Sequence, residues 1–166
     1  MMSIKQPAVN FKKDDDYETP KYVWEMICNE KFISKKKKLY DPFYCRGNTA
    51  SVMEELGYDC IHEDEDFFGN HQRHDYDIIL SNPPFSIKKK VFDELKKIDK
   101  PFIMIVPIST ITKKYFIDNF KDDDITICIP PKRMQFMKNG EQLKCCWFDT
   151  IFLCYKMGYS KSMIYL

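Results

Sequence analysis

The stretch "DIILSNPPFSIKKK", residues 77–90, predicts a strand that ends abruptly and is followed by a helix. Its first residues are mostly apolar and indicate a buried strand. That strand must stop at Pro83-Pro84, because proline donates no backbone hydrogen bond. Residues 86–98 then predict an amphipathic helix. The turn between the two elements therefore presents Asn82 and Phe85 at the end of a buried strand.

Outside this stretch, apolar strand-like segments alternate with amphipathic helix-like segments, which predicts an α/β fold. The sheet is expected to be mostly parallel, with the last two strands added as an antiparallel hairpin. Residues 65–76 are polar and predict a loop. The predicted strands lie at 38–41, 58–64, 76–81, 101–108, 125–130 and 145–156, and the predicted helices at 20–32, 48–57, 86–98 and 113–120.

Two of these helices carry recognisable end residues. Thr19 is expected to cap the first helix, with Pro20 at its first position, where the missing N–H costs nothing. Asn48 or Thr49 is expected to cap the second helix, and Gly57 to close it.

The chain has 166 residues, of which 44% are hydrophobic and 31% charged, as in ordinary globular proteins. Residues 1–166 are expected to form one compact domain without a separate recognition domain, and its residues 1–16 are expected to be a flexible N-terminal segment. The longest apolar run is too short to span a bilayer, and the N-terminus lacks the apolar core of a secretory signal. We therefore expect a cytoplasmic protein, in the host cell if its origin is a virus or phage.

Metal binding is not expected. The seven cysteines form no C-x-x-C pair and mostly lie in apolar runs, so a zinc site and a disulfide framework are both disfavoured. His71 and His74 lie near acidic residues, but histidines spaced along a loop are more often not ligands.

The net charge is only +1, so charge alone does not predict a nucleic-acid-binding protein. Basic residues are instead grouped locally, at 35–38, 88–90 and 131–133. Each group either contacts a phosphate backbone or forms a solvated face.

The turn Asn82-Pro83-Pro84-Phe85 has the chemistry needed to hold a planar amine. The prolines stiffen the turn, so that the Asn82 side-chain oxygen and the Pro83 carbonyl can accept hydrogen bonds from one external donor. Accepting both protons of an exocyclic amine directs its lone pair toward an electrophile, while Phe85 stacks on the ring that bears the amine.

"NPPF" resembles motif IV of the amino-methyltransferases that use S-adenosylmethionine, most of all the N6-adenine DNA methyltransferases. The resemblance implies a Rossmann-like class I methyltransferase fold and direct methyl transfer from S-adenosylmethionine to the N6 amine of adenine. Asn82, Pro83, Pro84 and Phe85 would then be the catalytic residues. An NPP turn can also be simply a rigid strand end.

Two upstream segments resemble cofactor-binding motifs of the same family. "YETP" at 17–20 resembles motif X, which implies that Tyr17, Thr19 and Pro20 help to hold the methionine part of the cofactor. "DPFYCRGNTA" at 41–50 resembles motif I, the turn that approaches the cofactor closely. The residues implied for motif I are Asp41, Pro42, Phe43 and Gly47, whereas Cys45 stands where the family usually has its first glycine.

Acidic residues after the second strand resemble the next two motifs. Asp64, or else Glu63, matches the acid that binds the ribose hydroxyls, and Asp66 with Phe67 resembles motif III, which contacts the adenine of the cofactor. The helix and strand that usually separate these motifs have little room here, so we expect this part of the fold to be abbreviated.

"PPKRMQF" at 130–136 loosely resembles motif VIII. The resemblance makes Phe136 a candidate for packing against the flipped base, and Lys132 and Arg133 candidates for phosphate contacts. The alternative is a hairpin loop in which Phe136 covers the core. Lys88, just after the NPPF turn, is a further candidate for guiding the DNA strand.

Several alternatives stay open. RNA is the main one, because loops of structured RNA offer unpaired adenines. A protein glutamine presents a similar planar nitrogen, and a non-catalytic methyltransferase-like binding domain would have the same fold. Carbon-5 cytosine methylation is disfavoured because the chain has no Pro-Cys dipeptide for the nucleophile. Target specificity would have to come from short loops, a homo-oligomer or a partner subunit.

Overall fold

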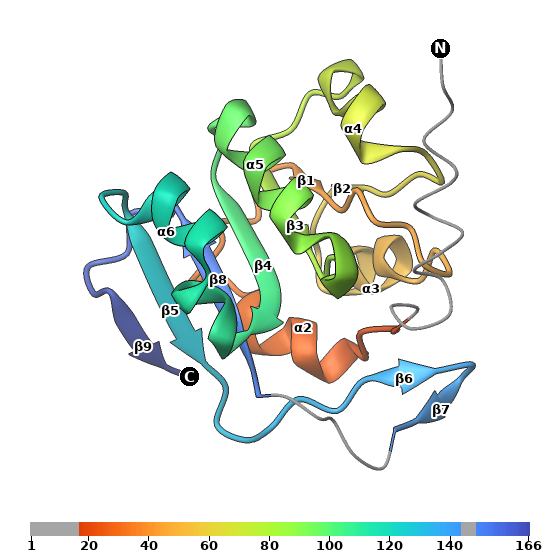
Figure 1. Cartoon of the computed structure of the whole chain (residues 1–166). Helices are drawn as coiled ribbons and strands as arrows, with labels where there is room; N and C mark the ends of the chain where they lie inside the picture. The colour runs from red at the N-terminus through yellow and green to blue at the C-terminus, as the bar shows by residue number, and fades with distance from the viewer. Residues whose placement is uncertain (1–16, 144–148) are drawn as a thin grey trace.

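The computed structural model describes residues 17–143 and 149–166. Within these ranges the main sheet has the strand order β2-β1-β3-β4-β8-β5-β9, and β6 and β7 form a separate small hairpin (Figure 1). The strands of the main sheet are β1 (Leu39–Tyr40), β2 (Cys60–Ile61), β3 (Ile78–Ser81), β4 (Phe102–Pro107), β5 (Ile125–Ile129), β8 (Thr150–Tyr155) and β9 (Met163–Tyr165). The hairpin consists of β6 (Met137–Lys138) and β7 (Glu141–Gln142).

The sheet is mostly parallel, as predicted. β1 pairs in parallel with β2 and β3, β3 with β4, and β5 with β9. β8 is antiparallel to both β4 and β5 and lies between them, with Phe102 opposite Tyr155 and Pro107 opposite Thr150. The predicted antiparallel pairing of the last two long strands is confirmed, whereas β9 was not predicted.

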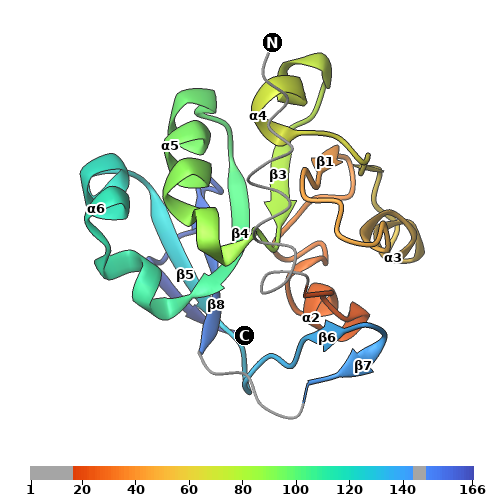
Figure 2. The same cartoon turned by 45° about the vertical axis from the view of Figure 1, so that its right-hand side comes forward.

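Helices cover both faces of the sheet (Figures 1 and 2). One face packs against α2 and α3, which contribute residues such as Trp24 and Met53 to a core with Leu39, Leu80 and Ile105. The other face packs against α4, α5 and α6. The fold is therefore the Rossmann-like three-layer arrangement expected of class I methyltransferases. The helices are α2 (Lys21–Ile27), α3 (Thr49–Glu55), α4 (Phe67–Asn70), α5 (Lys88–Ile98) and α6 (Lys114–Phe120), with 3₁₀ turns η1 (His71–Arg73), η2 (Phe85–Ile87) and η3 (Ile108–Thr112).

The β3-α5-β4 unit forms as its sequence predicts. All residues of β3 and β4 are buried, because consecutive side chains point to opposite faces and helices cover both. Val91, Phe92 and Leu95 form the buried stripe of α5. Asp99 is the C-cap residue of α5 and adopts a left-handed conformation with φ 56°.

Several predicted boundaries are wrong. The first helix ends at Ile27 and not at residue 32, because the Asn29 side chain accepts a hydrogen bond from the Lys31 N–H (3.2 Å) and forms a local turn. Pro20, not Thr19, occupies its N-cap position. Asn48 is the N-cap residue of α3 but makes no side-chain capping bond. The strand predicted at 58–64 is reduced to β2.

The segment 65–76, predicted to be a loop, contains α4 and η1. Asp66 starts α4, where its side chain accepts a hydrogen bond from the Phe68 N–H (3.2 Å). Phe67 is 2% exposed, and burying its ring against the sheet stabilises this short helix.

None of the helices in the described part of the chain is long and apolar enough to cross a membrane. The predicted flexible segment 1–16 and the beginning of the strand predicted at 145–156 lie outside the described residues, which resume at residue 149.

Candidate active site

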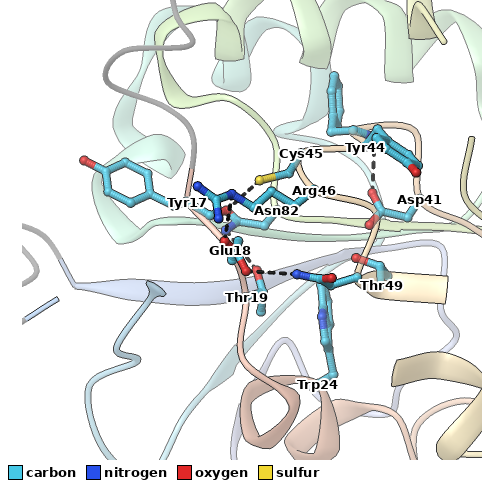
Figure 3. Close-up of a pocket in the computed structure, with 12 residues that line it drawn as sticks. Tyr17, Glu18, Thr19, Trp24, Asp41, Tyr44, Cys45, Arg46, Thr49 and Asn82 are labelled. Atoms are coloured by element: carbon cyan, nitrogen blue, oxygen red, sulfur yellow. Dashed lines mark hydrogen bonds and ion pairs between the residues drawn. The ribbon is translucent and has the colours of Figure 1, made fainter. Parts of the chain in front are cut away.

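The strand order creates a crevice between the carboxyl ends of β1 and β3. From β1 the chain continues through α3 to β2, which lies on one side of β1. On the other side lies β3, from which the chain continues through α5 to β4 in the opposite direction along the sheet. In such sheets ligands bind where the strand order reverses. A pocket lies at this place, and its lining comes from residues 17–24, the turn 41–49 and Asn82 (Figure 3). The predicted motifs X, I and IV therefore meet at one site.

Asp41 is the buried centre of this region. Asp41 is 2% exposed, and its Oδ1 accepts hydrogen bonds from Ser81 Oγ (2.5 Å) and the Phe43 N–H (3.2 Å). His62 Nδ1 lies 3.5 Å from Oδ2. Burial raises the pKa of Asp41, against the lowering effects of His62, Ser81, Thr49 and the Phe43 N–H. Asp41 thus joins the end of β1 to the end of β3.

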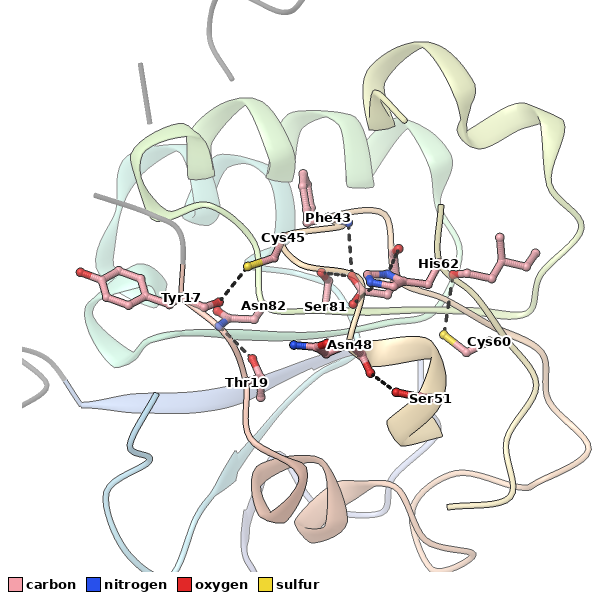
Figure 4. A network of polar contacts seen from close by, with 12 residues as sticks. Tyr17, Thr19, Phe43, Cys45, Asn48, Ser51, Cys60, His62, Ser81 and Asn82 are labelled. Carbon is pink, nitrogen blue, oxygen red and sulfur yellow. Dashed lines mark hydrogen bonds and ion pairs between the residues drawn. The ribbon is translucent and has the colours of Figure 1, made fainter. Parts of the chain in front are cut away.

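Asn82 follows β3 directly and contacts the motif X segment. Its Nδ2 donates a hydrogen bond to Thr19 Oγ1, with a distance of 3.0 Å (Figure 4). Pro83 and Pro84 are buried, whereas Asn82 and Phe85 are half-buried. Catalysis by these four residues remains a prediction.

The turn after Asp41 has an unusual backbone at two positions. Cys45 has φ 48° and Gly47 has φ 76°, both in the left-handed region that favours glycine. The positive φ at position 45 explains why a glycine suits this position, and Cys45 adopts the left-handed conformation although it is not a glycine. Cys45 is exposed, and its Sγ lies 3.8 Å from the Tyr17 carbonyl oxygen at the pocket.

Gly47→Ala should lower the free energy of unfolding more than Gly140→Ala. Both glycines have similar positive φ, 76° and 78°, so both changes carry the left-handed strain of about 1–2 kcal/mol. A Cβ at position 47 would additionally lie 2.5 Å from Tyr44 Oη, whereas nothing lies within 4 Å at position 140. We expect Gly47→Ala to cost about 1–3 kcal/mol more.

Urea unfolding of both variants measures this difference. The Tyr44 ring is stacked on His62, with ring centroids 4.9 Å apart, so it cannot move away without losing that contact. Equal decreases in the free energy of unfolding of the two variants would show that the Tyr44 ring moves away from the new Cβ without destabilising the protein.

Glu18 connects three parts of the pocket, a role that sequence reasoning missed. Its carboxylate binds Arg46 Nε (3.0 Å) and Asn48 Nδ2 (2.9 Å), and it is 12% exposed. The Glu18 backbone exchanges hydrogen bonds with Met137 of β6 (2.8 and 2.9 Å). Arg46 also donates to Asn139 Oδ1 (2.5 Å). No local pattern in the sequence indicates these long-range contacts.

Trp24 is a second pocket residue that the sequence did not reveal. It lies on α2, is 1% exposed and belongs to the core on that side of the sheet. Its Nε1–H is buried without a hydrogen-bond partner among the described residues. Because an unsatisfied buried donor costs free energy, this N–H is suited to a ligand in the pocket.

The acidic residues after β2 do not line this pocket. Asp64 and Glu63 are exposed beyond the end of β2, Asp66 starts α4, and Phe67 packs on Phe43 with ring centroids 5.4 Å apart. Their predicted contacts with ribose and adenine remain predictions. Phe43 does line the pocket and therefore connects it to Phe67.

The predicted motif VIII residues are dispersed. Phe136 is 1% exposed and belongs to the core on the α2 side, so the core alternative holds for this residue. Its predicted packing against a flipped base stays a prediction. Lys132 and Arg133 are exposed, and Arg133 pairs with Asp149 (2.7 Å). Both line a separate groove beside Tyr22 of α2.

A group of possible metal ligands occurs elsewhere among the described residues. Atoms of Glu63, Glu65 and His74 lie within 4.8 Å of one another. Glu65 already forms a close pair with His74 and an ion pair with Arg73 (3.6 Å). These contacts explain why the Glu65 and His74 side chains lie together without a metal ion.

No family model matches the chain. A segment of 49 residues, 30% of the chain, is 39% identical to the type II methyltransferase M.EcoRI of Escherichia coli. The match covers 15% of the length of that protein.

Several solved structures are similar to this chain, among them the following three methyltransferases. Precorrin-6y C5,15-methyltransferase from Geobacter metallireducens has a TM-score of 0.45 at 9% identity, covering 85% of this chain and 92% of that one. A human methyltransferase 10 domain containing protein has a TM-score of 0.43 at 9% sequence identity, and the match covers 95% of this chain and 100% of that one. A SAM-dependent O-methyltransferase from Thermotoga maritima has a TM-score of 0.42 at 10% sequence identity, and the match covers 97% of this chain and 68% of that one. Each TM-score is below 0.5, so the fold is assigned from the strand order and the helix layers of this chain alone.

Proposed function

We propose that this chain is an S-adenosylmethionine-dependent methyltransferase that methylates the N6 amine of adenine in DNA. The observation that carries the proposal is the Asn82–Phe85 turn, which follows β3 beside the pocket at the switch point of the sheet. The segment similar to M.EcoRI, a type II methyltransferase, supports methyl transfer as the class of reaction.

The chemistry follows from the acceptors of the turn. Asn82 Oδ1 and the Pro83 carbonyl accept the two protons of the target amine, so that its lone pair points toward the pocket. S-adenosylmethionine supplies an electrophilic methyl group when bound. Transfer forms the nitrogen–carbon bond while the carbon–sulfur bond breaks, and the nitrogen then releases one proton to solvent. Phe85 stacks on the base that carries the amine.

The cofactor binds in the pocket lined by the motif X and motif I segments. Trp24 Nε1–H is a donor there, and Arg46, which also pairs with Glu18, contributes a positive charge that suits the cofactor carboxylate. Asp41 shapes the turn that carries Arg46.

A nucleic acid is proposed as the substrate because basic residues lie near the turn, and DNA is preferred because NPPF resembles the turn of the N6-adenine DNA methyltransferases. Lys88 Nζ is 5.5 Å from the centroid of the Phe85 ring, and Lys89 and Lys90 follow it along α5. Lys132 and Arg133 line the separate groove beside α2 and are further candidates for phosphate contacts. These residues contact phosphates without reading sequence, so loops, a second copy or a partner subunit supply target specificity.

Labelled S-adenosylmethionine, offered with double-stranded DNA, single-stranded DNA and RNA in parallel, tests this proposal. Nucleoside mass analysis should find N6-methyladenine in DNA. N6-methyladenine in RNA alone would overturn the DNA assignment. Absence of transfer to any polymer, despite cofactor binding by calorimetry, would overturn the enzymatic proposal in favour of a binding domain.

Trp24→Phe should weaken S-adenosylmethionine binding about tenfold, because it removes one hydrogen-bond donor and keeps most of the ring packing. The matched control is Tyr22→Phe, since Tyr22 lies on the same helix but lines the other groove. Calorimetric titration measures both affinities. Equal affinities for the wild type and Trp24→Phe would remove Trp24 from the cofactor site.

A further inference from the structure

The side chain of Asn82 cannot make the local hydrogen bond that orients similar residues in this protein. Asp41 and Asp66 each accept a hydrogen bond from the N–H two positions ahead, that of Phe43 and Phe68, at 3.2 Å in both cases. For Asn82 that position is Pro84, which has no N–H. Pro83 removes the neighbouring N–H as well, so neither of the two positions after Asn82 offers an N–H to fix the orientation of the amide.

Thr19 supplies an orienting contact from a distant part of the chain. Its Oγ1 accepts a hydrogen bond from Asn82 Nδ2 at 3.0 Å. A carboxamide has its donor and its acceptor on opposite sides, so the contact that uses Nδ2 turns Oδ1 away from Thr19. Reversal of the amide would instead present the NH₂ group to an incoming amine, which is repulsive.

The backbone around Thr19 is well held. Glu18 forms two backbone hydrogen bonds with Met137, and its carboxylate binds Arg46 and Asn48. On the other side, the Pro20 carbonyl accepts a hydrogen bond from the Val23 N–H at the start of α2 (3.0 Å). The Thr19 hydroxyl is therefore presented from a fixed position.

We infer that Thr19 is a positioning residue that orients the Asn82 amide with Oδ1 toward the target amine. The inference rests on the proposed function, in which Asn82 Oδ1 accepts a proton of that amine. It gives Thr19 a role toward the substrate side of the pocket, distinct from the contact with the methionine part of the cofactor that the motif X resemblance implies.

The test compares Thr19→Val, which has the same shape without the hydroxyl, with Thr19→Ser, which keeps it. Thr19→Val should lower kcat for methyl transfer about tenfold, the equivalent of about one hydrogen bond. The calorimetric Kd for S-adenosylmethionine should change less than threefold, and Thr19→Ser should restore most of kcat. A weaker cofactor Kd with unchanged kcat would overturn the inference and return Thr19 to the cofactor.

A second measurement does not depend on catalysis. The side-chain NH₂ signals of Asn82, assigned in ¹H–¹⁵N spectra by their loss in Asn82→Ala, should shift in Thr19→Val and stay near their positions in Thr19→Ser. Unchanged signals in Thr19→Val would overturn the inference. If these signals shift but the wild-type protein methylates nothing, the contact stands and the proposed function fails.

Discussion

Asn82→Ala should abolish methyl transfer while leaving cofactor binding nearly unchanged. The substitution removes the oxygen that accepts a proton of the target amine, and loss of one such group at a reacting centre typically costs about 10²–10³ in kcat. Among the described residues, the Asn82 side chain contacts the motif X segment through its hydrogen bond to Thr19, so little of the fold depends on it. Single-turnover methyl transfer and calorimetric titration with S-adenosylmethionine measure the two quantities.

Asn119→Ala is the matched control for Asn82→Ala. Asn119 is another half-buried asparagine, on α6, and donates hydrogen bonds to Asp93 (2.9 Å) and the Tyr115 carbonyl (2.8 Å). Its loss should lower stability without lowering kcat. Activity near that of the wild type in Asn82→Ala would contradict the proposed mechanism, whatever the control does.

Asp41→Ala should lower the free energy of unfolding by about 3–5 kcal/mol, because it breaks a buried polar network. The change leaves the Ser81 hydroxyl and the Phe43 N–H without their acceptor at the junction of β1 and β3 and removes the carboxylate 3.5 Å from His62 Nδ1, which keeps its contact with the residue 41 carbonyl. Urea unfolding measures the loss. Asp41→Asn keeps an acceptor oxygen and should cost clearly less, and equal costs for the two variants would contradict the network account.

The same network makes a prediction about pH. Burial raises the pKa of Asp41 in the folded protein. A carboxyl group with a raised folded pKa contributes stability that is fully present below its unfolded pKa and is lost as the pH rises through the folded value. Asp93 and Asp99 have lowered pKa values because of hydrogen bonds from Lys89 and Lys156, and their contributions have the opposite sign.

The difference between wild type and Asp41→Asn isolates the Asp41 contribution, since the other carboxyl groups are shared. The wild type should lose stability relative to Asp41→Asn as the pH rises from the unfolded pKa of Asp41. A difference that does not change with pH would show that the Asp41 pKa is not raised.

Much of the fold could be predicted because its signals are local. The apolar run of β3, the prolines that end it and the amphipathic α5 follow from neighbouring residues alone. The mostly parallel sheet followed from the alternation of strands and helices. Predictions were poorer at helix ends and at 65–76, where the burial of Phe67 stabilises a short helix that local polarity does not suggest.

The sequence by itself determined the alternation of strands and helices and the rigid NPPF turn at the end of β3, beside which the pocket lies. Only the tertiary structure decided which side chains meet there, because hydrogen bonds such as Asn82 to Thr19 join residues 63 positions apart and leave no periodic pattern in the sequence. Burial likewise depends on the packing of distant elements. It placed Phe136 in the core and left the Trp24 N–H, buried and without a partner among the described residues, at the pocket.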